Sequence, residues 1–223
     1  MVIQPNSKLL MIGDSITDCG RVRPLADTPD GLGTGYVSLI NACLTAVMPQ
    51  TPIQIINMGI SGNTVRDLAA RWQRDVMAQR PDWLSIMIGI NDVWRHFGAR
   101  PQIEPTIDLE EYSQTLERLV QTTRPYLKGL VLMTPYLIEP DRADPMRAKM
   151  DAYGAVVGEL AGRYTAVLVD TQAAFDTVLA DLEPQALADD RIHPNLAGHM
   201  ILARAFLQAV ETIYRKRIVT FLI

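Results

Sequence analysis

Short apolar runs along the chain alternate with longer stretches in which apolar residues recur at helical spacing. The apolar runs predict five β-strands, at residues 9–12, 53–57, 83–88, 130–133 and 166–169. The amphipathic stretches predict five helices, at residues 36–47, 65–78, 109–127, 145–163 and 196–214. Because a helix separates each strand from the next, we expect an α/β fold with one parallel sheet covered on both faces.

The two longest irregular stretches are residues 18–35 and 97–108, which follow the first and third predicted strands. Segments that leave the carboxyl ends of parallel strands are where doubly wound folds bind ligands. No repeat or linker divides the chain, so we expect one domain over residues 1–217 and an apolar tail over residues 218–223.

Composition narrows the classes of function. The chain has 223 residues, of which 48% are hydrophobic, and a net charge of −4, so it can bury the core of one domain. Its short basic cluster, residues 215–217, fits the end of a helix better than a nucleic-acid site. No apolar run reaches the length of a membrane span, and residues 9–12 are too few for a signal-peptide core.

The reactive side chains are few. Cys19 and Cys43 give no disulfide framework, and the three histidines form no metal motif. We therefore expect a cytoplasmic enzyme that needs no metal or cofactor and has neither a membrane nor a nucleic acid as its partner.

Two short motifs at opposite ends of the chain carry the chemistry. Gly13-Asp14-Ser15 follows the first strand, and Asp190-Arg191-Ile192-His193-Pro194 precedes the last helix. A serine hydroxyl becomes a nucleophile when an imidazole takes its proton, and the imidazole needs a partner for its other nitrogen. Asp190 lies three residues before His193, a spacing that makes them neighbours in a turn. Asp189 is an adjacent competitor. These residues predict acyl transfer through a serine.

Two glycine-containing segments follow the second and third strands, at residues 59–63 and 89–92, so that four motifs converge on one edge of the sheet. Each has a plainer interpretation. Ser15 could be a helix N-cap, and Asn91 and Asp92 could likewise be caps. Gly59 and Gly62 could form a turn or an anion-binding loop. Ser61 is a rival nucleophile, to which we assign a structural role because the nucleophile elbow of α/β-hydrolases would need a glycine at position 63.

The residues Ser15, Gly62, Asn91 and His193, in this order, resemble the four blocks of the SGNH, or GDSL-type, hydrolase family. The blocks run from residue 13 to residue 194, nearly the whole domain. The resemblance implies a three-layer αβα domain with a five-stranded, flavodoxin-like parallel sheet. It also implies a triad of Ser15, His193 and Asp190, and an oxyanion hole made by the backbone N–H groups of Ser15 and Gly62 and the amide of Asn91.

Residues 60–68 and 87–95 are similar to the carbohydrate acetylesterase branch of this family, particularly to intracellular acetylxylan esterases. That similarity implies an acetylated small molecule or xylo-oligosaccharide as substrate. Trp94 could close an acyl pocket or offer a face to a sugar, or simply pack in the core. Further candidates for substrate binding are Asp14, Tyr36 and His96. Asp189 is evidence against a sugar substrate, because it places a charge beside the triad, where an aromatic ring would indicate a sugar site more strongly.

Two alternative functions remain. A lysophospholipase or thioesterase of the same family would prefer long acyl chains. A nucleotide or anion binder would use residues 59–64 at a helix N-terminus, although the chain lacks both G-x-G-x-x-G and the P-loop pattern. The apolar tail, Ile218-Val219-Thr220-Phe221-Leu222-Ile223, could cover its own domain or another subunit. We favour the second and expect a homo-oligomer.

Overall fold

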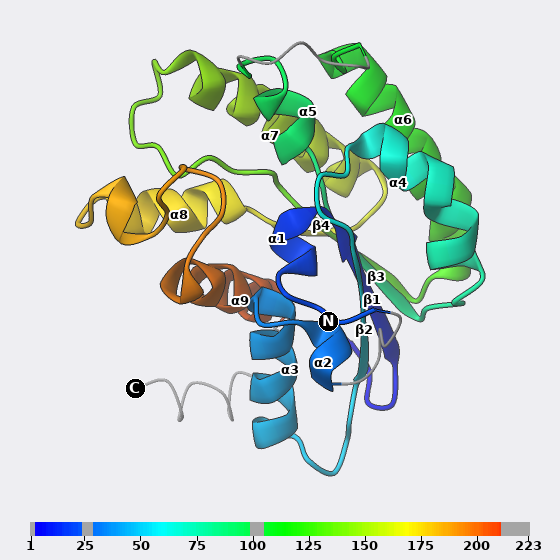
Figure 1. The fold of residues 1–223 in the computed structure, drawn as a ribbon. Coiled ribbons are helices and arrows are strands. Elements are labelled where there is room, and N and C mark those ends of the chain that lie inside the picture. The colour runs from blue at the N-terminus through cyan, green and yellow to red at the C-terminus, as the bar shows by residue number, and fades with distance from the viewer. Residues whose placement is uncertain (1–2, 24–28, 99–104, 211–223) are drawn as a thin grey trace.

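A parallel sheet of five strands forms the centre of the molecule, in the order β2-β1-β3-β4-β5 (Figure 1). The computed structural model describes residues 3–23, 29–98 and 105–210. The strands are β1 (Lys8–Gly13), β2 (Gln54–Gly59), β3 (Trp83–Met87), β4 (Gly129–Met133) and β5 (Val167–Val169). All four pairings are parallel, which confirms the predicted α/β class.

Helices cover both faces of this sheet. In the described part of the chain they are α1 (Ser15–Asp18), α2 (Pro29–Leu32), α3 (Tyr36–Val47), α4 (Val65–Trp72), α5 (Ile90–Trp94), α6 (Leu109–Thr123), α7 (Pro145–Arg163), α8 (Thr171–Leu179) and α9 (Leu196–Val210). On one face α3 packs against α9, and on the other α4 and α7 pack against α6 (Figure 1). The result is the expected three-layer αβα arrangement.

The central strands β3 and β4 are buried along their whole length, and β1 is buried from its second residue. Strands buried on both faces read as continuous apolar runs, which is why their positions were predictable. The predicted strands agree with the observed ones to within one or two residues at each end. Among the described residues, no helix combines the length and the apolar character that crossing a membrane requires.

Several helices differ from the predictions. The predicted helix 65–78 is α-helical only to Trp72 and continues as a π-helical segment, Gln73–Met77. The predicted helix 109–127 ends at Thr123, because Pro125 belongs to a short 3-10 turn, Arg124–Tyr126. The predicted irregular stretch 18–35 contains α2. The last predicted helix, 196–214, is observed to Val210; its remainder, the basic cluster 215–217 and the tail 218–223 lie outside the described residues.

Candidate active site

Ser15 is positioned by the turn from β1 into α1. Asp14 is 2% exposed, and its Oδ1 accepts a hydrogen bond from the backbone N–H of Ile16 at 3.0 Å, so it caps the helix. Ser15 is therefore the first helical residue, and its own N–H has no partner within the helix. This arrangement places both the hydroxyl and the backbone N–H of Ser15 at the carboxyl edge of the sheet, where a substrate can reach them.

The turn before α9 supplies the base and its partner. Asp190 Oδ1 accepts hydrogen bonds from the backbone N–H groups of Ile192 at 3.0 Å and His193 at 2.8 Å. Its Oδ2 lies 2.6 Å from His193 Nδ1, and His193 Nε2 lies 3.0 Å from Ser15 Oγ. Arg191 holds the turn in a left-handed conformation, with φ of 67°. The structure thus joins carboxylate, imidazole and hydroxyl in one chain of hydrogen bonds.

The charge of Asp190 fixes the state of the histidine ring. Burial raises the pKa of Asp190, but hydrogen bonds from the His193 ring and from the backbone of His193 and Ile192 outweigh burial and hold that pKa below its ordinary value. An ionised Asp190 accepts a hydrogen bond from Nδ1–H, so the proton stays on Nδ1 and Nε2 is left as the acceptor for Ser15. Asp190, and not the exposed Asp189, is the carboxylate that the structure brings to the ring.

The donors for an oxyanion come from two further loops. Gly62, between β2 and α4, has φ of 80°, a left-handed conformation that glycine adopts without steric strain. Within the described part of the chain, the Gly62 N–H donates no hydrogen bond. Asn91, at the start of α5, is 6% exposed and donates one amide hydrogen to Asn63 O at 2.9 Å. A second amide hydrogen remains available on the same nitrogen.

The loop that carries Gly62 is held by three side chains from two places in the sequence, α1 and the segment of α5. Asp18 Oδ2 accepts from the backbone N–H of Ser61 at 2.9 Å, just before the glycine. Arg95 Nη2 donates to Gly62 O at 2.9 Å. Asp92 Oδ1 accepts from the backbone N–H of Val65 at 3.0 Å and so caps α4 from a neighbouring helix. Sequence reasoning identified a cap at Asp92 as one alternative but missed Asp18 and Arg95, whose partners are distant in the sequence.

Two carboxyl groups are buried beside this loop. Asp14 and Asp92 are 2% and 1% exposed, and burial raises the pKa of each to about 7. For Asp14 the charge of Asp92 contributes to this raised pKa, after burial. Within the described residues, Asp92 Oδ2 has no hydrogen-bond partner. Both groups act through the backbone they cap, because burial keeps them away from any substrate.

The candidate substrate-binding residues divide by exposure. Trp94, at the end of α5, is 41% exposed, and its ring lies edge-on to His193 with 6.2 Å between ring centroids. Tyr36 is 1% exposed, and its hydroxyl lies 3.0 Å from Thr17 Oγ1. The expectation that Tyr36 and Asp14 contact substrate is therefore corrected: both are core residues, and only Trp94 of these three reaches the open site.

The remaining histidines have structural partners. His96, also a candidate for substrate binding, has its Nε2 2.7 Å from Ile107 O. His199 is buried in α9, where its Nδ1 accepts the backbone N–H of Tyr36 at 3.2 Å. Burial, followed by the charge of His193, lowers the pKa of His199 to about 4, so the ring stays neutral. The described part of the chain contains no group of three His, Cys, Asp or Glu side chains that could hold a metal ion.

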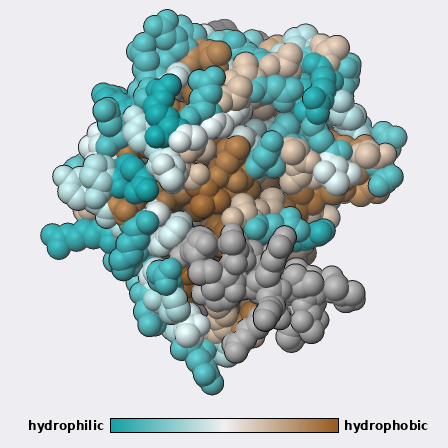
Figure 2. Space-filling model, turned by 180° about the vertical axis from the view of Figure 1, so that it is seen from behind, coloured by the Kyte–Doolittle hydropathy of each residue, from teal (hydrophilic) through white to brown (hydrophobic). Residues whose placement is uncertain are grey.

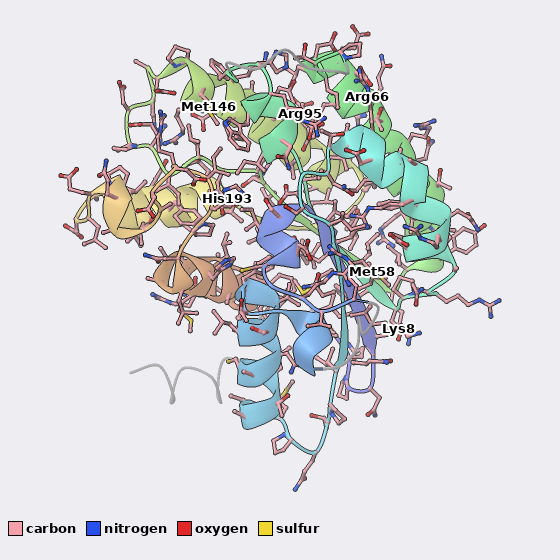
Figure 3. The ribbon with its side chains drawn as sticks, viewed as in Figure 1. Lys8, Met58, Arg66, Arg95, Met146 and His193 are labelled. Atoms are coloured by element: carbon pink, nitrogen blue, oxygen red, sulfur yellow. The ribbon has the colours of Figure 1, made fainter. Side chains whose placement is uncertain are left out.

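Figure 3 shows how the site is arranged: His193 lies beside α1, with Arg95 directly after α5 and Met146 at the start of α7 on the same side of the molecule. Segments far apart in the sequence therefore meet at the carboxyl ends of β1, β2 and β3, the edge that the sequence indicates for the chemistry.

Comparisons with known proteins agree with this geometry. The model of the GDSL-like lipase/acylhydrolase family matches residues 11–201. The chain is 56% identical over 211 residues to an acetylxylan esterase of Geobacillus stearothermophilus, covering 94% of this chain and 96% of the relative. It is 28% identical over 177 residues to thioesterase 1/protease 1/lysophospholipase L1 of Escherichia coli K12, covering 78% of this chain and 76% of the relative.

Solved structures give the same result. The crystal structure of Axe2, the acetylxylan esterase from Geobacillus stearothermophilus, superposes with a TM-score of 0.92 at 56% identity, covering 95% of this chain and 97% of that one. Structures of Axe2 also exist as catalytic mutants in which a serine, a histidine or an aspartate is replaced by alanine. By sequence, fold and site geometry, this chain belongs to the GDSL-like lipase/acylhydrolase family and is a hydrolase of carboxylic esters.

Proposed function

We propose that this enzyme removes acetyl groups from acetylated xylo-oligosaccharides. The observation that carries the chemistry is the chain of hydrogen bonds from Asp190 through His193 to Ser15, with separations of 2.6 and 3.0 Å. The observation that supports the substrate is the 56% identity to an acetylxylan esterase over nearly the whole chain.

The first half of the reaction forms an acyl-enzyme. Ser15 Oγ attacks the carbonyl carbon of the acetyl ester while its proton passes to His193 Nε2. The bond between that carbon and the sugar oxygen then breaks, and the leaving oxygen takes the proton from Nε2. The products of this half are the free sugar hydroxyl and an acetyl group on Ser15.

The second half repeats these transfers with water. A water molecule attacks the acetyl carbon and gives a proton to Nε2, and Ser15 Oγ takes that proton back as acetate leaves. Throughout, Asp190 holds the proton on Nδ1 and stabilises the imidazolium that forms twice per turnover.

Negative charge develops on the carbonyl oxygen at each attack. We assign its stabilisation to the backbone N–H groups of Ser15 and Gly62 and to the second amide hydrogen of Asn91. The hydrogen bonds of Asp18, Asp92 and Arg95 to the Gly62 loop support this assignment. They fix the loop before the reaction, so its donors need no reorganisation while the charge develops.

The alternative function is that of a lysophospholipase or thioesterase of the same family, which the 28% identical relative from Escherichia coli favours. A non-catalytic nucleotide or anion binder is the third candidate. The acyl chain separates the first two, since an acetyl-specific site loses rate with each added carbon. Covalent labelling separates the third, since a binder forms no adduct with an organophosphonate.

The proposal is tested by a hydrolysis panel of acetylated xylo-oligosaccharides and p-nitrophenyl esters of increasing acyl length. The enzyme is expected to hydrolyse the acetylated sugars and to prefer acetate among the aryl esters, and Ser15→Ala is expected to remove all of this activity while the protein remains folded. A preference for long acyl chains would instead establish the lysophospholipase alternative.

We further propose that the enzyme works in the cytoplasm as a homo-oligomer. Cys19 and Cys43 form no disulfide within the described part of the chain, which supports a reducing compartment. Exposed apolar side chains on β5 and α9, among them Leu168 and Leu196, support self-association.

A further inference from the structure

A groove with a volume of about 320 Å³ adjoins the catalytic turn. Its sides come from three segments: the end of α5 with Trp94 and Phe97, the start of α7 with Met146, and the catalytic turn itself with Asp190 and Arg191. The groove therefore begins at the carboxylate that orients His193 and leads away from the triad.

One wall of the groove is aromatic and open to solvent. Trp94 and Phe97 are 41% and 44% exposed, although both are large apolar side chains. They lie three residues apart on consecutive turns, a spacing that puts both rings on the same side of the segment. The Trp94 ring also stands at 77° to the His193 ring, so the aromatic wall starts directly at the catalytic base.

The opposite part of the groove is polar and fixed. Arg191 Nη2 lies 3.0 Å from Glu139 Oε2 and 2.9 Å from Asp144 Oδ2, which ties the catalytic turn to the segment before α7. Asp144 in turn caps α7 by accepting the backbone N–H of Met146 at 2.9 Å. One guanidinium between two carboxylates leaves this side with a net negative charge, and its carboxylate oxygens accept hydrogen bonds from hydroxyl groups rather than bind an anionic ligand.

An aromatic wall facing fixed polar groups suits a neutral pyranose ring, whose C–H face stacks on an aromatic ring while its hydroxyls bond to polar groups. A long acyl chain would leave the polar side without partners. The reaction also dictates which part of the ester lies here. Because His193 returns its proton to the leaving oxygen, the leaving group must lie next to the His193 ring.

We propose that this groove binds the sugar of the ester, with one pyranose ring against Trp94 and Phe97, and so determines the preference for a carbohydrate leaving group. This inference rests on the proposed acetylesterase function and assigns the substrate's leaving group to a specific surface. It also gives the sugar an aromatic platform at Trp94 and Phe97, in a groove whose lining does not include Asp189.

The first test compares two acetate esters that differ only in the leaving group, an acetylated xylobiose and p-nitrophenyl acetate. In Trp94→Ala and Phe97→Ala, the ratio of kcat/KM on the sugar ester to kcat/KM on the aryl ester should fall roughly tenfold, the size of effect expected for a lost stacking contact. Trp94→Phe should restore most of the ratio. The matched control is Tyr126→Ala, which removes an aromatic ring that is 74% exposed in the turn before β4, and the ratio should not change.

A second test measures binding without turnover. Of the three tryptophans, Trp72 and Trp83 are 4% and 7% exposed, so an aqueous quencher such as iodide reaches chiefly Trp94. In Ser15→Ala protein, xylotriose should protect tryptophan fluorescence from iodide, and Trp94→Phe should abolish the protection.

The outcomes separate the groove from the proposed function. If the enzyme deacetylates xylo-oligosaccharides but the ratio is unchanged in Trp94→Ala and Phe97→Ala, the groove assignment is wrong and the function stands. If the enzyme hydrolyses only aryl acetates, the proposed substrate is wrong, and the quenching measurement alone judges the groove. Protection by xylotriose then supports a sugar site, and its absence at millimolar xylotriose overturns it.

Discussion

The side-chain amide of Asn91 carries two hydrogens. One binds Asn63 O at 2.9 Å and fixes the amide plane, and we propose that the other binds the oxyanion. Asn91→Ala should lower kcat by roughly 10² to 10³ with little change in KM, because the lost bond forms only in the transition state. Steady-state kinetics on p-nitrophenyl acetate measure both constants. A rise in KM with kcat unchanged would instead make Asn91 a ground-state binding residue.

The buried carboxyl of Asp92 makes stability depend on pH. Its pKa is about 7 in the folded protein against an ordinary value of 3.8, because burial disfavours the charge. Between these values the unfolded chain has released the proton and the folded protein has kept it, so the free energy of unfolding falls as pH rises from about 4 to about 7.

Asp92→Asn tests this dependence, since asparagine keeps an oxygen for the Val65 N–H and has no proton to lose. The variant should lose less Tm than the wild type as pH rises from about 4 to about 7, as followed by thermal melts across that range. Asp14 keeps part of the slope in both proteins, because burial raises its pKa to about 7 as well. Melting curves that shift in parallel would mean that Asp92 does not titrate in this window.

At the residue scale, the sequence indicated which side chains could carry out the chemistry, but it did not indicate which side chains are exposed to a substrate. Ser15, His193 and Asp190 were predictable because the reaction demands their side-chain types and the turn demands their spacing. Tyr36 was wrong as a rim residue because an aromatic after an irregular stretch can face either way, and only the fold shows its hydroxyl bonded to Thr17. Phe97 gave no signal, because its neighbour Met146 lies far along the chain.

At the scale of elements, the loop between β2 and α4 depends on two glycines for different reasons. A Cβ on Gly59 would lie 2.2 Å from the backbone nitrogen of Asp18, so alanine there would push against α1 and thus against Ser15. A Cβ on Gly62 would meet nothing within 4 Å, and only its φ of 80° opposes a side chain. At Gly59 close packing excludes a side chain, whereas at Gly62 only the left-handed backbone conformation disfavours one.

We expect Gly59→Ala to destabilise the protein by about 1–3 kcal/mol, as overpacking in a close-packed interior does. Gly62→Ala should cost about 1–2 kcal/mol, the strain of a left-handed residue, and leave the neighbouring backbone in place. Urea unfolding measures both, and the expected order is a larger loss for Gly59→Ala. The opposite order would show that the left-handed conformation at Gly62 matters more for stability than the close contact between Gly59 and α1.

The strands and most of the longer helices were predictable from their apolar patterns, whereas the shortest helices were not. The strands were found because burial on both faces makes them continuous apolar runs. The helices α1 and α5 have four and five residues, too few for a helical period, and both were missed although they carry Ser15 and Asn91. The nine-residue α8 was also missed, but Asp170, whose side chain caps it by accepting the Ala173 N–H, was a usable signal.

At the scale of the whole molecule, the layered architecture followed from the alternation of strands and helices, but the sheet order needed the structure. The order β2-β1-β3-β4-β5 places β1 beside both β2 and β3, which brings Ser15, Gly62 and Asn91 to adjacent strand ends. His193 joins them from the far end of the chain. The convergence of the four motifs was predicted from their positions after the predicted strands and before the last helix, and its physical reason is this central place of β1.

Exposed apolar side chains on the surface support the proposed self-association of the chain. Figure 2 shows an apolar area in the middle of the face opposite to that of Figure 1. On β5 and α9, Leu168, Leu196 and Met200 are 40%, 64% and 42% exposed. Deleting residues 218–223 should shift the protein to a smaller assembly in light scattering, and Leu196→Ser with Met200→Ser should weaken the assembly through the described surface. A full-length protein that is monomeric at micromolar concentration would exclude both interfaces.

We propose that Ser15 is the nucleophile and that His193 activates it. Labelling with a fluorophosphonate followed by peptide mass spectrometry tests it most directly, because the phosphonyl adduct is stable and marks the attacking oxygen. We predict a single adduct on Ser15, absent in Ser15→Ala and still formed in Ser61→Ala. An adduct on Ser61, or an enzyme that hydrolyses acetate esters and takes no label, would contradict the account.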